Sequence, residues 1–77
     1  QLPSDGAEYI GADAAIEIAS AHSGITQSDM LKKEAKLKII KGAYVYEVEF
    51  ETPEYEFEYL IDAKTGKILS AEKELND

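Results

Sequence analysis

The stretch YEVEFETPEYEFEYLID, Tyr46–Asp62, decides how this chain folds. Nearly every second residue is acidic, and large apolar residues occupy most of the positions between them. Such alternation is typical of β-strands that bury one face and leave the other in water. Thr52-Pro53-Glu54 interrupts the pattern. Because proline cannot donate a hydrogen bond to a central ladder, the stretch is predicted to form two strands, 44–50 and 55–61, joined by a loop.

The flanking segments extend this pattern into an α+β fold. Residues 30–40 and 67–74 alternate in the same way, and Lys41-Gly42 and the run from Asp62 to Gly66 have the composition of tight turns. Residues 12–22 instead repeat apolar side chains with the spacing of a helix, which Gly24 is placed to end. The sequence therefore predicts one N-terminal helix packed on a four-stranded antiparallel meander.

The apolar positions also predict a register. A two-residue turn at Lys41-Gly42 pairs Leu37 with Tyr46, and a four-residue loop at 51–54 pairs Tyr46 with Tyr59. Every core pair then lies on one face, where the helix is expected to pack. The opposite face is predicted to carry three rows of side chains: Lys38, Val45, Leu60 and Leu69; Lys36, Glu47, Glu58 and Ala71; Glu34, Glu49, Glu56 and Lys73.

The domain organisation is simple. Residues 1–9, with Pro3 and Gly6, are predicted to be a flexible lead-in, residues 10–74 a single domain, and residues 75–77 a frayed tail. The chain begins at Gln1 rather than methionine, as expected for a piece of a longer, processed product.

Composition excludes several classes of function. A formal charge of −8 and the absence of arginine argue against nucleic acid and anionic membranes as partners, whereas a basic protein surface would be attracted. No apolar run approaches the roughly 18 residues of a membrane span. With no cysteine and one histidine, His22 in the last turn of the helix, neither a catalytic cysteine nor a multi-histidine metal site can form. We therefore expect no enzymatic activity and no cofactor or metal.

Two features of the outer face are candidate binding sites. Glu47 and Glu58 belong to an acidic cluster, which is either a solvated face, a docking surface for a basic partner or, less favoured, a cation site. Val45, Leu60 and Leu69 form a candidate apolar contact patch. Alternatively, Leu2, Tyr9 or Leu75 folds over these side chains, or a second copy of the domain covers them.

The chain resembles the PepSY domain family. The resemblance rests on the alanine-rich helix that ends in His22-Ser23-Gly24, on YVYEVEF at 44–50, and above all on IDAKTGKIL at 61–69. It implies a helix on an antiparallel sheet, with Asp62 and Gly66 as structural residues of the turn. It brings no catalytic residues.

The resemblance also implies a setting and a role. PepSY domains occur in propeptides of secreted metallopeptidases and in bacterial envelope proteins, so an extracellular or cell-envelope location within a longer exported protein is expected. The family has been proposed to inhibit peptidases by non-covalent binding. We therefore expect a non-enzymatic module that modulates a secreted peptidase. The alternative is a structural module of a multi-domain surface protein, weakly self-associating through Val45, Leu60 and Leu69.

Overall fold

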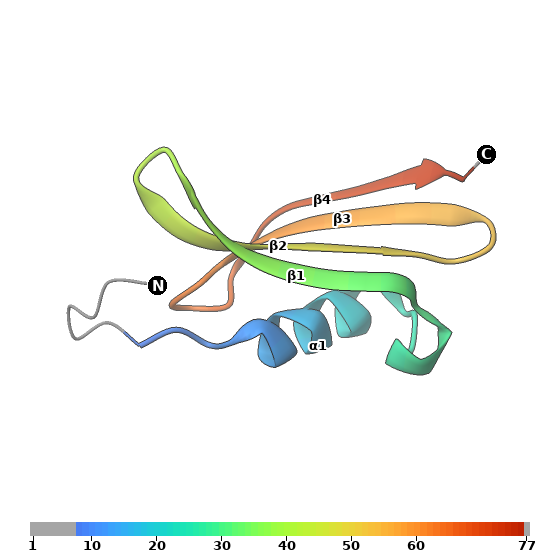
Figure 1. Cartoon of the computed structure of the whole chain (residues 1–77), viewed down its shortest axis with the longest axis horizontal. Helices are drawn as coiled ribbons and strands as arrows, with labels where there is room; N and C mark the ends of the chain where they lie inside the picture. The colour runs from blue at the N-terminus through green and yellow to red at the C-terminus, as the bar shows by residue number, and fades with distance from the viewer. Residues whose placement is uncertain (1–7, 77) are drawn as a thin grey trace.

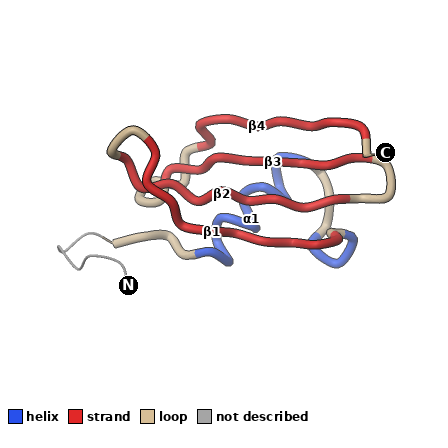
Figure 2. Tube along the Cα trace, turned by 45° about the horizontal axis from the view of Figure 1, so that its top comes forward, coloured by secondary structure: helices blue, strands red, loops and turns tan. Residues whose placement is uncertain are grey.

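The computed structural model describes residues 8–76, and the first seven residues of the predicted lead-in lie outside this range. One helix, α1 (Ala12–Ser23), is followed by a short 3-10 turn, η1 (Gln27–Asp29), and by four strands. The strands are β1 (Leu31–Ile40), β2 (Ala43–Glu51), β3 (Tyr55–Asp62) and β4 (Ile68–Leu75). They form an antiparallel sheet in the order β1-β2-β3-β4, with α1 against one face (Figures 1 and 2). The predicted α+β fold is confirmed.

Helix α1 ends as the sequence predicted. Gly24 takes a left-handed conformation, φ +80°, and its N–H donates to the Ser20 carbonyl at 2.9 Å. The buried side chains of α1 are Ala15, Ile16 and Ala19. Because two of these three are alanines, the helix can lie close to the sheet.

The core fills the space between α1 and the sheet. Val48, Phe50 and Ile61 are its largest fully enclosed side chains. The rings of Phe50 and Phe57 stack with centroids 4.7 Å apart, which adds to the free energy gained by burying them. We call this covered side of the sheet the inner face and the opposite side the outer face.

Two turns hold the hairpins together. Lys41 and Gly42 both have positive φ, +51° and +83°, as a two-residue turn of the primed type requires. In the turn after β3, Asp62 Oδ1 accepts the N–H groups of Lys64 and Thr65 at 2.9 Å each. These backbone hydrogen bonds hold the pKa of Asp62 below its usual value.

The predicted register is confirmed for β1 and β2 but wrong for β2 and β3. Leu37 pairs with Tyr46 as expected, whereas Tyr46 pairs with Ile61 rather than Tyr59. The reason is a tighter loop: β2 continues to Glu51, which pairs with Glu56, so only residues 52–54 connect the strands. A shift of two residues preserves the faces, because side chains alternate with a period of two.

A bulge at the start of β4 changes which of its residues lie on each face of the sheet. Ile61 pairs with Ile68, but the register shifts by one residue between Leu60 and Ile61, so Leu60 pairs with Ser70 rather than with Leu69. Ala71 and Lys73 therefore lie on the inner face, opposite Tyr59 and Phe57, and not on the outer face as the sequence suggested.

Both ends of the described chain are attached to the sheet. The Ile10 N–H donates to the Ala63 carbonyl at 2.8 Å, and the ring of Tyr9 lies 5.3 Å from that of Tyr44. At the other end, Leu75 pairs with Tyr55, and the Asn76 N–H donates to the Glu54 carbonyl at 2.9 Å. Leu75, the first residue of the tail that the sequence predicted to fray, is thus the last residue of β4. Residue 77 lies outside the described range.

Candidate functional site

The outer face is the most strongly charged surface of the described chain. Its composition follows from the register, which sets four cross-strand rows: Lys38, Val45 and Asp62; Lys36, Glu47, Leu60 and Ser70; Glu34, Glu49, Glu58 and Glu72; Leu31, Glu51, Glu56 and Glu74. One row consists entirely of glutamates, one from each strand. Like charges directly opposite one another destabilise a sheet slightly, so these rows cost stability rather than supply it.

The corrected register redistributes the predicted charge neighbours. Glu58 lies opposite Glu49 and Glu72, and not opposite Glu47. Three lysines approach the face: Lys36 contacts Glu34 at 2.8 Å, Lys38 contacts Glu47 at 2.6 Å, and Lys32 lies 3.9 Å from Glu51. Lys73, which the predicted rows placed on this face, lies on the other side. The outer face therefore keeps a strongly negative potential.

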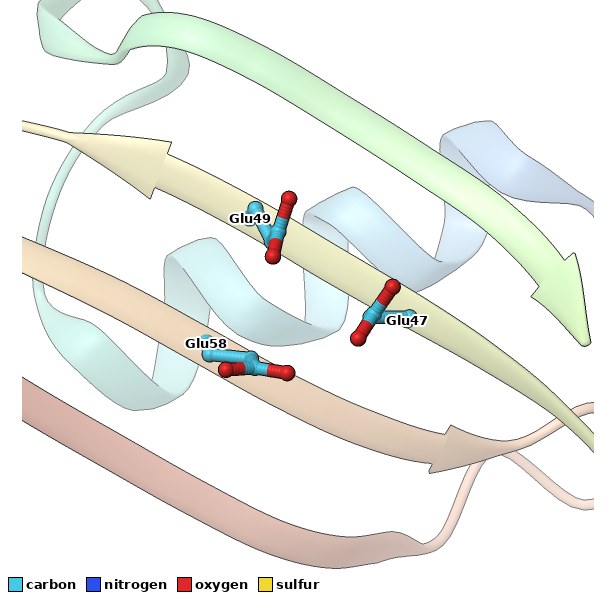
Figure 3. A group of neighbouring side chains, drawn as sticks. All are labelled: Glu47, Glu49 and Glu58. Atoms are coloured by element: carbon cyan, nitrogen blue, oxygen red, sulfur yellow. The ribbon is translucent and has the colours of Figure 1, made fainter. Parts of the chain in front are cut away.

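Glu47, Glu49 and Glu58 converge on this surface. Figure 3 shows their carboxylates in front of β2 and β3, with α1 behind the sheet. The hydrogen bond to Lys38 lowers the pKa of Glu47, whereas the hydrogen bond to Glu47 and burial raise the pKa of Glu58. Lys38 keeps Glu47 ionised, and both the neighbouring Glu47 carboxylate and burial disfavour ionisation of Glu58.

The three carboxylates could each offer an oxygen to a cation, because these atoms lie within 4.8 Å of one another. Calcium, however, takes about six to eight oxygen ligands, and loop carbonyls commonly supply some of them. The Glu47 carboxylate is also engaged by Lys38. Glu56, which the sequence placed in the same cluster, does not belong to this group.

A shallow hollow of about 330 Å³ lies on the outer face. All four strands contribute to its lining, through Glu34, Glu49, Glu58 and Glu72, and Lys32 stands at its side. The hollow is where the row of four glutamates crosses the sheet. A basic side chain would be attracted there without meeting a steric barrier.

The predicted apolar patch is smaller than expected. Val45 is 2% exposed, because it is enclosed between its neighbours in the sheet, so a partner cannot reach its side chain. Leu60 is half-buried, and Leu69, at the bulge, is 49% exposed. Tyr9 does not cover them, since it packs with the inner-face core, and Leu75 pairs with Tyr55 in an inner-face row. Leu2, the other expected cover, lies outside the described residues, and within residues 8–76 neither Tyr9 nor Leu75 covers Leu60 and Leu69.

His22 has a structural environment. Its Nδ1 lies 2.9 Å from the Tyr59 hydroxyl, and the two rings meet edge to face. Burial raises the pKa of Tyr59, so its hydroxyl stays protonated and can share this hydrogen bond. The contact fastens the end of α1 to β3.

Sequence reasoning missed one inner-face interaction. The Lys73 ammonium lies 4.2 Å from the centre of the Tyr55 ring and 5.9 Å from that of Phe57, within the range of cation–π attraction. A bulge in β4 was needed to bring Lys73 to these rings, and alternation alone places it on the outer face. Alternation therefore gave no signal of this contact.

Comparison with known proteins establishes the family. Residues 9–72 match the model of PepSY, the peptidase propeptide and YPEB domain, and this match covers most of the chain. The chain belongs to the PepSY family. No curated protein and no solved structure matches it significantly.

Membership defines a class of protein. PepSY is a propeptide-like, regulatory domain family that is generally non-catalytic, it is linked to peptidase regulation, and its members occur in extracytoplasmic bacterial proteins. Within residues 8–76, no helix has the length and apolarity to cross a bilayer.

Proposed function

We propose that this chain is a non-enzymatic, extracytoplasmic binding module that modulates a secreted peptidase by non-covalent contact through its outer sheet face. Family membership supports the class of role. The observation that carries the choice of surface is the composition of the outer face: seven of the eight residues in two adjacent rows are glutamates. The exposed Leu69 lies at the start of β4, next to the bulge.

The chemistry of this face specifies the kind of contact. Side chains that repel one another in the free domain are attracted by opposite charge on a partner. Complementary potentials of this kind speed association and exclude wrong partners. Leu60, which lies opposite Glu47, and the exposed Leu69 at the start of β4 add apolar area, and such area supplies affinity. A peptidase surface with lysine or arginine around an apolar depression would complement both features.

The test is titration of the domain into activity assays of secreted peptidases. The informative pair of variants is Leu69→Asp and Leu75→Asp, which make the same change at the two exposed leucines of β4, one at the bulge and the other at the end of an inner-face row. Saturable inhibition with a midpoint below about 10 μM, roughly −7 kcal/mol of binding, is expected for the wild type. Leu69→Asp should weaken it at least about tenfold, since a buried leucine contact contributes about 1.5–3 kcal/mol.

The control variant, Leu75→Asp, distinguishes binding through the outer face from binding through the inner face. Leu75→Asp should inhibit as well as the wild type, because Leu75 belongs to an inner-face row. Flat inhibition curves for every peptidase tried would count against the proposal, and so would equal loss in both variants. A mass that rises with concentration and falls back in Leu69→Asp would instead identify the structural, self-associating module. Such self-association would bring together the acidic faces of two domains that each carry a formal charge of −8.

A further inference from the structure

The two edges of the sheet differ in how they are protected. Strand β1 lies over α1, which packs against β1 and β2, whereas β4 borders the sheet on the far side from the helix (Figures 1 and 2). β1 also carries a bulge between Leu31 and Glu34, with Lys32 at φ +52°. Bulges and lysines are the usual devices that prevent another strand from pairing with an edge.

Strand β4 has a regular, open edge. Its bulge lies at its start, and from Ser70 to Leu75 every residue pairs in sequence with β3. We call residues 70–75 the β4 edge. Proline is absent from it, and its side chains are exposed except for the half-buried Ser70. Such a segment can accept a further strand.

The direction of the backbone groups can be derived. The Asn76 N–H donates to the Glu54 carbonyl, so residues 54 and 76 form a hydrogen-bonded pair of the antiparallel ladder. Hydrogen-bonded and non-hydrogen-bonded pairs alternate. The N–H and C=O groups of Ala71, Lys73 and Leu75 therefore point away from β3, toward the open side of the sheet.

A hollow adjoins this edge on the inner face. It measures about 250 Å³ and lies between the end of α1 and β4. The side chains of His22, Phe57 and Tyr59 line it, together with Ala71 of the β4 edge. A strand added beside β4 would place an inward side chain next to Ala71, at the mouth of this hollow.

The two sides of the β4 edge determine the chemistry of the added strand. On the outer face, Glu72 and Glu74 would lie beside its outward residues, and opposite charges on neighbouring strands stabilise a sheet. On the inner face, its alternate residues would meet Ala71 at the mouth of the aromatic hollow, Lys73, whose ammonium lies over the Tyr55 ring, and the Leu75 side chain, which is 74% exposed. Basic residues outward and apolar residues inward satisfy both sides.

We propose that the β4 edge binds an extended segment of a partner protein as a fifth strand, with lysine or arginine on its outward face and apolar residues on its inward face. Backbone hydrogen bonds to Ala71, Lys73 and Leu75 hold the segment, and alternate side chains give specificity. A second copy of this chain is a poor occupant. Antiparallel pairing of two β4 strands about an axis normal to the sheet makes the outer faces continuous and, with Lys73 opposite its own copy, sets Glu72 of each strand beside Glu74 of the other.

This site is independent of the proposed function, which uses the outer face and Leu69. A domain that regulates no peptidase could still bind a strand at β4. The two ideas are also tested by different assays.

The experiment uses the capped peptide KVKFKVK, which alternates basic and apolar residues, and its isomer KKVFVKK, which has the same charge but no alternation. Each is titrated into the ¹⁵N-labelled chain while amide signals are followed. KVKFKVK is expected to bind about tenfold or more tightly than the isomer, because only its alternation satisfies both faces. Its largest shifts should fall on residues 70–75 and on the hollow at His22 and Tyr59.

Two variants at Ala71 test the backbone contact. Ala71→Pro removes an N–H that faces the open side, so the β3–β4 ladder is kept while one intermolecular hydrogen bond is lost. It should weaken KVKFKVK about threefold to tenfold. Ala71→Val keeps the N–H and should bind like the wild type.

A charge exchange keeps the proposal testable if Ala71→Pro fails to fold. The double variant Glu72→Lys/Glu74→Lys should lose KVKFKVK and gain EVEFEVE. Equal binding of the two isomers would overturn the proposal in favour of general attraction to the acidic face. Shifts centred on β1, or self-association abolished by Ala71→Pro, would overturn it as well.

Discussion

The inner and outer faces of the sheet are built by alternate residues of the same strands, yet their side chains have opposite roles. On the inner face Val48, Phe50 and Ile61 are enclosed by α1 and by one another. On the outer face glutamates stand opposite glutamates, and no described element covers them. The difference teaches that one face holds the domain together, while the other is free to serve binding because folding does not depend on it.

The largest effect should come from breaking the inner face. Ile61→Ala is expected to cost about 3–4 kcal/mol, since it leaves a cavity at a fully buried site. The outer-face control Glu56→Ala should change stability by no more than about 0.5 kcal/mol. Urea unfolding of the two variants measures both values. A loss for Glu56→Ala that approaches that for Ile61→Ala would contradict the division between faces.

An intermediate effect is expected where a turn meets the inner face. Gly66 has φ +79°, and an added Cβ would lie 3.1 Å from Ile18 Cδ1 and 3.8 Å from Ile10 Cδ1. Gly66→Ala should cost about 1–2 kcal/mol through backbone strain, and more through this contact.

The matched control for Gly66 is Gly24→Ala. Gly24 has nearly the same φ, +80°, but nothing within 4 Å of its added Cβ. It therefore carries the strain without the contact. In thermal unfolding, the melting temperature of Gly66→Ala should be lower than that of Gly24→Ala. Equal melting temperatures would show that Ile18 moves aside freely.

The smallest effect should come from the outer face and should depend on pH. The pKa of Glu58 is raised above its usual 4.5 in the folded chain. Its protonated form therefore contributes to the stability of the wild type at low pH, and this contribution is lost as pH rises from 4.5 through the raised pKa. At pH 7, Glu58→Gln should therefore stabilise the domain by about 0.5 kcal/mol by removing like-charge repulsion. At pH 4 this gain should shrink.

The stability contribution of Glu47 depends on pH in the opposite direction. Its pKa is lowered by Lys38, so its contribution is present above 4.5 and is lost as pH falls through the lowered value. Glu47→Gln should lower the melting temperature at pH 7. Melting curves of both variants at the two pH values measure the contrast, and shifts of the same sign at pH 7 would contradict the roles assigned to Lys38 and Glu58.

The sequence by itself determined which residues face the core. Alternation with a period of two assigns Tyr46, Val48 and Phe50 to one face and Glu47 and Glu49 to the other, and this assignment survives a shift of register by two residues. The helix, the turn at Lys41-Gly42 and the family motif at 61–69 were equally readable, because glycine positions and apolar spacing are local signals.

Only the tertiary structure decided which charges are neighbours. A three-residue loop at 52–54 placed Glu58 directly opposite Glu49 while keeping its carboxylate close to Glu47, and one bulge moved Lys73 from the acidic face to the ring of Tyr55 and left Leu69 exposed. Loop length and bulges depend on how whole strands pack against the helix and one another, and a local pattern does not record them. The faces of β1, β2 and β3 were therefore set by sequence, whereas the face of β4 and the composition of the binding surfaces were set by packing.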